Sequence, residues 1–364
     1  MQVMFVDDES RVLSGIERAF MLQDSQWEFR FATSGPEALT MLGETPADVV
    51  ISDMRMPFMD GAELLSQVRE RWPGTIRIIL SGYSDPDSTQ RMLDVAHRLV
   101  SKPCDSSTLS EIIENAFALR TLFPQPWVLD CVGRITHLPA APDIFMQVQH
   151  LLENAASNSQ QIAELLGRDP ALSAKIMQLA NSAWFCKGSP VYDIASAITL
   201  LGVDRISLLV MTSHARVEAQ KASHPSALQR TAFLASALAA HIVGHHGLES
   251  TAALLANVAQ LIPEISETDE PVTTRDDTSP LAAVGAYLLA MWGLPLEIVE
   301  IVAGHDNPAR FGHNTFGAAG VVHVAVALAN HRMPDSDYLA TTGMLNQLPL
   351  WQQTFANLQE TLYD

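Results

Sequence analysis

"DVVISDMRMPFMDG", residues 48–61, is the stretch that decides the fold of the first part of the chain. It begins with an apolar, β-branched run typical of strands buried on both faces, and the run stops at Asp53. Similar runs predict five strands in all, at 2–7, 28–33, 48–52, 76–81 and 98–102. Segments with helical periodicity separate them, near 10–22, 36–43, 61–71, 87–97 and 107–122. Strands that alternate with helices predict a parallel sheet covered on both faces.

Polar residues stand where these predicted strands end: Asp7, Asp8, Asp53, Ser81 and Lys102. In a parallel sheet the carboxyl ends of the strands share one edge, and ligands bind there. Carboxylates gathered at one edge repel one another unless a cation compensates them, and their oxygen atoms suit Mg²⁺. A lysine opposite them would complete a charge-balanced phosphate site, and a hydroxyl could hydrogen-bond a phosphoryl oxygen.

Four motifs in this part of the chain resemble those of a known family: "VDDES" (6–10), "ISDMRMPFMDG" (51–61), "LSGYSD" (80–85) and "SKP" (101–103). Together they make residues 1–122 similar to the receiver domain of two-component response regulators. The resemblance implies a flavodoxin-like α/β fold. It also implies that Asp53 accepts a phosphoryl group from a histidine kinase or a phosphotransfer protein.

The resemblance assigns a role to every polar residue at the predicted edge. The residues that would bind Mg²⁺ are Asp7 (partly through water), Asp8, Asp53 and, through its backbone carbonyl, Arg55. Lys102 would pair with the phosphoryl group, and Ser81 would move toward it. The Lys102–Pro103 peptide bond is expected to be cis, as it often is in this family.

One position departs from the family pattern. Three residues before Lys102 the family usually has Tyr or Phe, which swings inward as the hydroxyl moves, whereas this chain has Leu99. Phosphorylation does not need that ring, so we expect the site to accept a phosphoryl group. Leu99 lacks the ring on which the usual coupling to the protein surface depends.

The character of the sequence changes after residue 122. "FPQPW" (123–127) breaks the last helix of the first domain and is interpreted as a linker. That helix either runs on past the sheet as a spacer or dimer contact, or packs back onto the first domain. From 128 to 364 apolar residues recur at three- and four-residue spacing, which predicts an all-helical domain. Residues 264–280 are acidic, polar and aperiodic, so a mobile loop is expected there.

The second part resembles an HDOD domain, an all-helical output module distantly related to the HD phosphohydrolases. The stretches that carry this resemblance are "ITHLPAAPDI" (135–144), "GRDPALSAKIMQLANSAWF" (167–185), "AITLLGVDRISLLV" (197–210) and "VGAYLLAMWGLPLEIVEIVAGHDNP" (284–308). An HD enzyme needs a His, a His–Asp pair and a later Asp that converge on a metal. The family pattern places these ligands at Thr231, Ala256, Asn257 and Val326. Methyl groups cannot bind a metal ion, so we expect a non-catalytic domain without a metal.

Other histidines supply the competing hypothesis, an HD-type metal-dependent phosphohydrolase or phosphodiesterase regulated by the receiver. His305 and Asp306 are adjacent in "GHDNP". A second group lies in one helical segment and comprises His241, His245 and His246. A spacing of four residues on a helix can bind zinc, but no Glu or third ligand accompanies it. A helix that ends in polar histidines and is capped by Gly247 is the simpler interpretation.

Composition narrows the range of functions further. A formal net charge of −19 argues against a broad basic face for nucleic acid, and no basic recognition helix of a transcription factor is visible. The three cysteines form no CxxC pair, and no export signal is visible at the first residues. No apolar run reaches the roughly 20 residues of a membrane span. We therefore expect a cytoplasmic protein that binds neither nucleic acid nor membrane.

These features favour a signalling protein over an enzyme that acts on an external substrate. Phosphorylation of Asp53 would alter how the helical domain binds or releases another protein. The expected partners are a histidine kinase or phosphotransfer protein and a downstream protein that the sequence does not identify. A second copy of the chain is a further candidate partner, and Mg²⁺ in the first domain is the expected cofactor.

Overall fold

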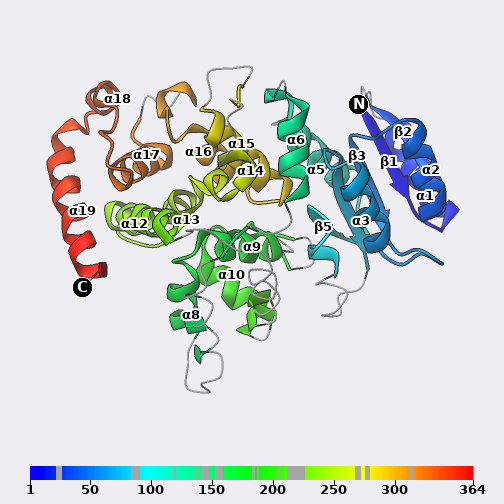
Figure 1. Ribbon diagram of the computed structural model, residues 1–364, viewed down its shortest axis with the longest axis horizontal. Coiled ribbons are helices and arrows are strands. Elements are labelled where there is room, and N and C mark those ends of the chain that lie inside the picture. Colours follow the sequence, from blue (N-terminus) through cyan, green and yellow to red (C-terminus); the bar gives the residue numbers. More distant parts are fainter. Residues whose placement is uncertain are drawn as a thin grey trace. The chain divides into compact units, whose positions relative to one another are not determined.

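The computed structural model of the chain divides into two compact units (Figure 1). Met1–Thr136, Ser182–Gly188 and Met291–Gly293 form the first unit, and His137–Asn181, Ser189–Ala290 and Leu294–Asp364 form the second. The structure describes residues 1–364 apart from 22–26, 83–90, 119, 124, 136–137, 141–143, 145–146, 149, 152–158, 183–184, 187, 204, 208, 211–225, 267–271, 275–278, 312–314 and 364.

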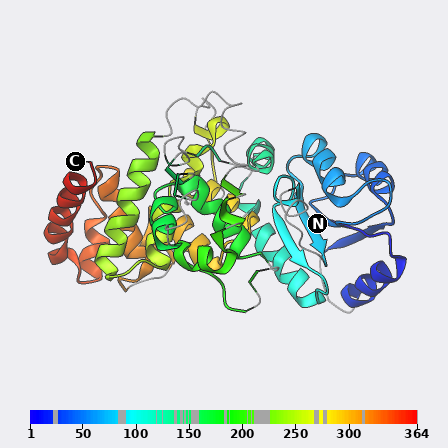
Figure 2. The same cartoon turned by 90° about the horizontal axis from the view of Figure 1, so that it is seen from below.

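The first unit contains the predicted parallel sheet. Its strands are β1 (Gln2–Val6), β2 (Glu28–Ala32), β3 (Val49–Asp53), β4 (Ile76–Ser81) and β5 (Arg98–Ser101). They lie in the order β2-β1-β3-β4-β5, and all neighbouring pairs are parallel. Figure 2 shows helices on both faces of the sheet. The predicted five-stranded α/β fold is confirmed.

The α-helices with described bounds in the first unit are α1 (Ser10–Met21), α2 (Gly35–Glu44), α3 (Gly61–Arg71), α5 (Ser106–Ala118) and α6 (Pro126–Arg134). Of the helix predicted over 87–97, residues 87–90 lie outside the described residues, and 91–93 are helical. Asp60 fixes the start of α3, because its carboxylate accepts a hydrogen bond from the Glu63 backbone N–H at 2.9 Å. This cap places the beginning of α3 a few residues after the end of β3.

The last helix predicted for the first domain is shorter than expected. α5 ends at Ala118 instead of 122, and a 3₁₀ turn, η1 (Arg120–Leu122), follows it. The Thr121 hydroxyl donates to the Ala118 carbonyl at 2.7 Å. Leu109 and Ile113 of α5 are buried. α5 therefore packs back onto the first unit, and of the two arrangements that the sequence leaves open this is the one observed.

α6 begins inside the predicted linker. Pro126 stands in its first turn, where the missing N–H of proline leaves no hydrogen bond unmade. Val128 and Val132 are buried, and α6 packs against α3. The sequence places the start of the second domain at 128, whereas the contacts of α6 join this helix to the first unit. The domain limits stay a prediction.

The second unit is built of helices, which confirms the predicted class; none of its described residues lies in a strand. Its α-helices are α8 (Ser159–Leu166), α9 (Pro170–Ala180), α10 (Ile194–Leu201), α12 (Ser226–Val243), α13 (Leu248–Leu255), α14 (Pro263–Ser266), α15 (Pro280–Met291, whose last residue is grouped with the first unit), α16 (Leu296–Gly304), α17 (Ala318–Ala329), α18 (Ser336–Thr341) and α19 (Leu348–Tyr363). Its 3₁₀ turns are η2 (Val258–Leu261), η3 (Pro308–Phe311) and η4 (Leu345–Gln347). α12, α13 and α17 pack against one another and form its centre.

Punctuating residues set the helix ends in the second unit. Asp169 caps α9, because its carboxylate accepts hydrogen bonds from the backbone N–H groups of Ala171 and Leu172. Gly202 ends α10 with a φ of 79°, a left-handed conformation that glycine adopts readily. Both residues are of the types that commonly start and end helices.

The mobile loop expected over 264–280 is described only in part. Residues 264–266 belong to the short helix α14, and 280 begins α15. Residues 267–271 and 275–278, on which the expectation mainly rests, lie outside the described residues. Among the helices that are described, none combines the length and the apolar character that crossing a bilayer demands.

Replacing Gly61 should weaken the first unit. A Cβ atom at this position would lie 2.1 Å from the backbone oxygen of Asp53, so Gly61→Ala forces β3 and α3 apart. We expect a loss of roughly 1–3 kcal/mol in the free energy of unfolding, measured by urea denaturation of the full chain. Gly43→Ala in α2 is the matched control, because its Cβ would meet nothing within 4 Å. Equal losses in both variants would contradict the close approach.

Candidate functional site

The carboxyl ends of four strands bring the predicted polar residues to one edge of the sheet. Asp53 is the last residue of β3 and Ser81 the last of β4, while Asp7 and Lys102 directly follow β1 and β5. The pairing of β1 with β3, β3 with β4 and β4 with β5 places these ends side by side. Asp7, Asp53 and Ser81 are buried, and Lys102 is half-buried.

Lys102 links two of the carboxylates. Its ammonium donates to Asp7 Oδ2 at 2.6 Å and forms a closer ion pair with Asp53 Oδ1. Burial opposes the charge on Lys102, but the hydrogen bonds to Asp53 and Asp7 outweigh it and raise the pKa of the lysine. Burial also raises the pKa of Asp53, against the effect of Lys102. Because Lys102 faces two carboxylates, it is charged and compensates one of their two negative charges.

The remaining oxygen atoms of the two buried carboxylates are held by the backbone. Asp53 Oδ2 accepts a hydrogen bond from the Arg55 N–H at 2.6 Å, and Asp7 Oδ1 accepts one from the Glu9 N–H at 2.9 Å. The Lys102–Pro103 peptide bond is cis, as the family resemblance implies. These contacts fix the orientation of both carboxylates before any ligand binds.

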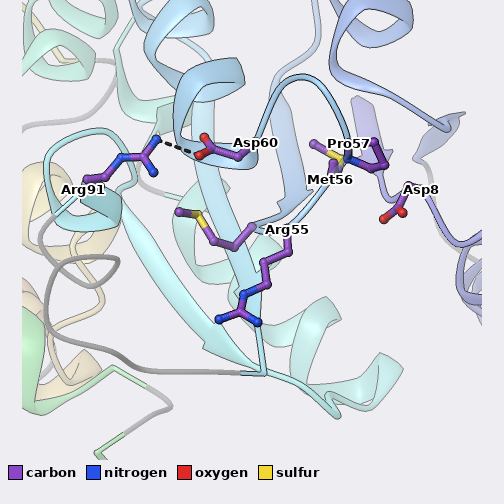
Figure 3. A pocket seen from close by; sticks show the side chains of 7 residues that line it. Asp8, Arg55, Met56, Pro57, Asp60 and Arg91 are labelled. Atoms are coloured by element: carbon purple, nitrogen blue, oxygen red, sulfur yellow. Dashed lines mark hydrogen bonds and ion pairs between the residues drawn. The ribbon is translucent and has the colours of Figure 1, made fainter.

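A pocket of about 470 Å³ opens at the loop that directly follows Asp53 in the chain (Figure 3). It is lined by Asp8, Met54, Arg55, Met56, Pro57, Asp60 and Arg91. In Figure 3 an ion pair joins Arg91 to Asp60, and Asp8 lies on the other side of the loop that contains Pro57. The Arg91–Asp60 distance is 2.7 Å. Sequence reasoning missed this pair, because 31 residues separate its members and no motif marks Arg91.

The donor atoms at this edge suit a magnesium ion. Asp8 and Arg55 are exposed and line the same pocket next to Asp53, so carboxylate and carbonyl oxygens are available there. Asp7 and Asp53 instead converge on Lys102. Among the residues that the structure describes, no three His, Cys, Asp or Glu side chains gather closely enough to hold a metal by themselves. The predicted ligands are therefore neighbours on one edge, and their chemistry fits Mg²⁺.

In the second unit, His305 and Asp306 form a different kind of group. His305 ends α16 and is only 3% exposed, and its Nδ1 lies 2.8 Å from the Val302 carbonyl, to which it donates. Its Nε2 lies 3.7 Å from Asp306 Oδ1. Asp306 also pairs with Arg332 at 3.2 Å. Burial lowers the pKa of His305, so the ring is neutral and its proton is on Nδ1.

His323 on α17 uses both ring nitrogens to join two segments of the backbone. Its Nδ1 donates to the His305 carbonyl at 2.8 Å, and its Nε2 accepts from the Asp335 N–H at 2.8 Å. Only the neutral ring can make both bonds. No sequence motif indicates this role. His323 therefore acts as a structural clamp, next to the pair that sequence reasoning singled out.

The remaining histidine candidates are exposed. His241, on α12, and His245 and His246, which follow that helix, lie at the surface. Gly244 directly follows α12, has a φ of 89° and donates to the Ala240 carbonyl, whereas Gly247 precedes α13 as its N-cap. The expected cap at Gly247 was thus wrong by three residues, because the left-handed turn comes earlier.

The positions assigned to HD ligands lie on or next to the packed helices of the second unit. Thr231 is on α12 and Val326 on α17, while Ala256 and Asn257 follow α13. The Thr231 hydroxyl donates to the Ala227 carbonyl of its own helix, and Ala256 and Val326 are buried apolar residues. The helices that would carry metal ligands are therefore in contact, with side chains of other chemistry at those positions.

The clamp predicts a pH-dependent stability. Burial lowers the pKa of both His305 and His323 below the ordinary value of 6.5, so the folded chain binds fewer protons than the unfolded chain. Their contribution is complete above that value and is lost as the pH falls below it. Urea denaturation of the full chain between about pH 5 and 8 should show this loss.

A variant of His323 separates the clamp from other titrating groups. His323→Gln should lower the free energy of unfolding at neutral pH by roughly 1–3 kcal/mol and flatten its decline in acid. His241→Gln, at an exposed ring, is the control and should change neither quantity. An acid decline in His323→Gln as steep as in the natural chain would contradict the assignment.

Two family models match the chain, one for each predicted domain. The response regulator receiver domain matches residues 3–114, and the HDOD domain matches residues 138–308. Among curated proteins, the chain is 39% identical over 85 residues to the hydrogenase transcriptional regulatory protein HoxA of Cupriavidus necator, which is 23% of this chain and 17% of that protein. It is 30% identical over 155 residues to the regulatory protein AtoC of Escherichia coli, which is 42% of this chain and 31% of that protein. The match spans about a third or less of the length of these relatives.

Solved structures similar to the chain include a signal receiver domain and a response regulator. The signal receiver domain of an HD domain-containing protein from Pseudomonas fluorescens is 28% identical, with 32% of this chain and 94% of that chain covered at a TM-score of 0.30. The MmoQ response regulator from Methylococcus capsulatus is 19% identical, with 59% and 98% covered at a TM-score of 0.47. From the two family matches together, the chain is a response regulator that joins a receiver domain to an HDOD domain.

Proposed function

We propose that phosphorylation of Asp53 switches this response regulator and that its HDOD domain transmits the signal by binding another protein. The observation that carries the proposal is the Asp53 carboxylate itself. It stands at the edge of the sheet, is held by Lys102 and the Arg55 backbone, and directly precedes Met54 and Arg55, which line an open pocket.

The chemistry is a phosphoryl transfer to a carboxylate oxygen. As the bond between Asp53 and phosphorus forms, the bond between phosphorus and the donor histidine nitrogen breaks, and the imidazole takes up a proton. Lys102, already paired with Asp53, supplies positive charge beside the entering group, and Ser81 offers a hydroxyl at the end of the neighbouring strand. Positioning and charge compensation are therefore the work of the protein.

The receiver would take Mg²⁺ through Asp8, Asp53 and the backbone carbonyl of Arg55, with Asp7 acting partly through water. The ion would supply charge compensation for the phosphoryl oxygens. The half-buried Lys102 is the only cation among the described residues shown in contact with both Asp7 and Asp53. Each added phosphoryl group brings nearly two negative charges, so a second cation is needed to balance the site.

We propose a non-catalytic role for the HDOD domain. Thr231, Ala256 and Val326 stand where the enzymes of the related family have metal ligands. His305 directs only one nitrogen toward Asp306, and Arg332 already neutralises that carboxylate. A domain without catalytic activity would act by binding through its surface. We therefore propose that the HDOD domain transmits the signal through a protein–protein interaction.

The expected partners follow from the same scheme. A receiver domain implies a histidine kinase or a phosphotransfer protein as the phosphoryl source. A downstream protein would bind the HDOD domain, and pairing with a second copy of the chain would be a further means of regulation. We propose a cytoplasmic location, where such kinases present their phosphohistidine.

Labelling by a small phosphodonor tests the acceptor. Acetyl phosphate with Mg²⁺ should add one phosphoryl group to the full chain, and Asp53→Ala should abolish the addition, as read by intact mass. Asp48→Ala is the matched control, because Asp48 precedes the same strand at its opposite end and pairs with Arg120. Labelling that persists in Asp53→Ala would identify another acceptor.

Metal analysis tests the non-catalytic output. We expect the purified full chain to retain no stoichiometric Zn, Mn or Fe, because His305 and Asp306 offer too few ligands. Elemental analysis after extensive dialysis checks this, with His305→Gln as a comparison. One equivalent of a transition metal in the natural chain, lost in His305→Gln, would instead favour an HD-type hydrolase.

A further inference from the structure

A buried cation lies at the edge of the sheet opposite to Asp53. Arg77, the second residue of β4, is 0% exposed, and so is His97, which directly precedes β5. The Arg77 guanidinium donates to the carbonyl groups of Val95 at 2.7 Å, Thr75 at 3.2 Å and Pro73 at 3.3 Å. Backbone carbonyl groups therefore supply much of the stabilisation of this buried charge.

One further acceptor comes from α6. Arg77 Nη2 donates to the Gly133 carbonyl at 2.7 Å and lies 2.8 Å from His97 Nε2. Gly133 is in the last turn of α6, where helix carbonyl groups have no partner within the helix and attract positive charge. Arg77 thus completes the hydrogen bonding of α6, and α6 completes that of Arg77. We call Arg77, His97 and Gly133 the Arg77 cluster.

The backbone of α6 approaches the turn before β4 very closely. A Cβ atom on Gly133 would lie 1.9 Å from the Pro73 carbonyl oxygen, so only glycine fits here. Next to it, the Gly74 N–H donates to the Asp130 carboxylate at 3.1 Å. These contacts leave little room for movement of α6. A shift that lengthens them leaves the buried Arg77 guanidinium with too few hydrogen-bond acceptors. α6 is therefore either docked or released, which makes it a two-state element.

The same two strands connect the Arg77 cluster with the phosphorylation site. β4 begins beside Arg77 and ends at Ser81, and β5 begins after His97 and leads to Lys102. Ile79 pairs with Leu99 in the middle of the two strands, and Leu99 is 4% exposed. A buried aliphatic side chain cannot rotate between surface and interior as a Tyr or Phe ring can. β4 and β5 therefore connect Ser81 and Lys102, at the end of the sheet where Asp53 lies, with the Arg77 cluster, on which α6 packs.

We propose that α6 transmits the effect of phosphorylation from the receiver to the rest of the chain. α6 is docked on the Arg77 cluster while Asp53 is unphosphorylated and is released when Asp53 carries a phosphoryl group. The proposal rests on the phosphorylation of Asp53 set out above. Movement of Ser81 and Lys102 toward the phosphoryl group shifts β4 and β5, and the cluster at their other ends loses its fit to Gly133. α6 directly precedes the HDOD domain in sequence, so its release changes the tether of that domain.

Hydrogen exchange of the full chain tests the release. Amide protection across 126–134 is measured by mass spectrometry with and without beryllofluoride and Mg²⁺, which mimic the phosphoryl group. We expect protection to fall by about tenfold with the mimic, within the usual range for coupled sites. Asp53→Ala should show no change. Fluorine NMR of the same samples reports separately whether beryllofluoride is bound.

Variants of α6 provide the second arm. Gly133→Ala cannot dock without a clash, so its 126–134 amides should be unprotected with or without the mimic. Because coupling is reciprocal, this variant should also bind beryllofluoride about tenfold more tightly. Asp130→Ala removes only the hydrogen bond to Gly74, so it should lower the amide protection and raise the mimic affinity by smaller factors. Gly43→Ala, whose Cβ meets nothing within 4 Å, is the matched control and should behave as the natural chain.

The outcomes separate the two ideas. Bound beryllofluoride with unchanged protection of 126–134 would overturn the role of α6 and leave the phosphorylation of Asp53 standing. Unaltered mimic affinity in both Gly133→Ala and Asp130→Ala would do the same. Failure of the natural chain to bind the mimic or accept a phosphoryl group would overturn the proposed function, and the role of α6 with it.

Discussion

The ion pair of Lys102 with Asp7 and Asp53 is the interaction on which the receiver site depends. Two buried carboxylates at one sheet edge repel each other, and a cation between them removes that cost. The arrangement requires the ends of β1, β3 and β5 to meet, which the order β2-β1-β3-β4-β5 provides. Since Lys102 holds one oxygen of each carboxylate and the Arg55 N–H holds the other oxygen of Asp53, the orientation of Asp53 is set without a ligand.

Other buried polar groups of the chain serve structure instead of chemistry, and their contacts show the difference. The Arg77 guanidinium and the His323 ring are bonded to backbone groups and join segments distant in sequence. Asp53 differs because its contacts are with Lys102 and because the loop that follows it lines an open pocket with two exposed charged residues, Asp8 and Arg55. Burial and perturbed pKa values alone would not have separated His305 from Asp53; the geometry around each group does.

Much of the fold was predictable because local patterns agreed with one another. Apolar runs identified all five strands, and helical spacing identified the segments between them. The candidate site was predictable because its residues directly follow or end strands, where parallel topology alone brings them together. The ion pair of Arg91 with Asp60 and the end of α5 at Ala118 were not predictable, since each depends on contacts with distant residues.

By itself, the sequence determined the sheet, the helical second half and the polar residues at the ends of the strands, since periodicity and side-chain chemistry are local properties. Only the tertiary structure decided that α6 belongs to the sheet unit and that His323 is a clamp. Both rest on hydrogen bonds between backbone groups and side chains far apart in the chain. A backbone carbonyl is present at every residue, so no sequence pattern can say which one a buried side chain will find.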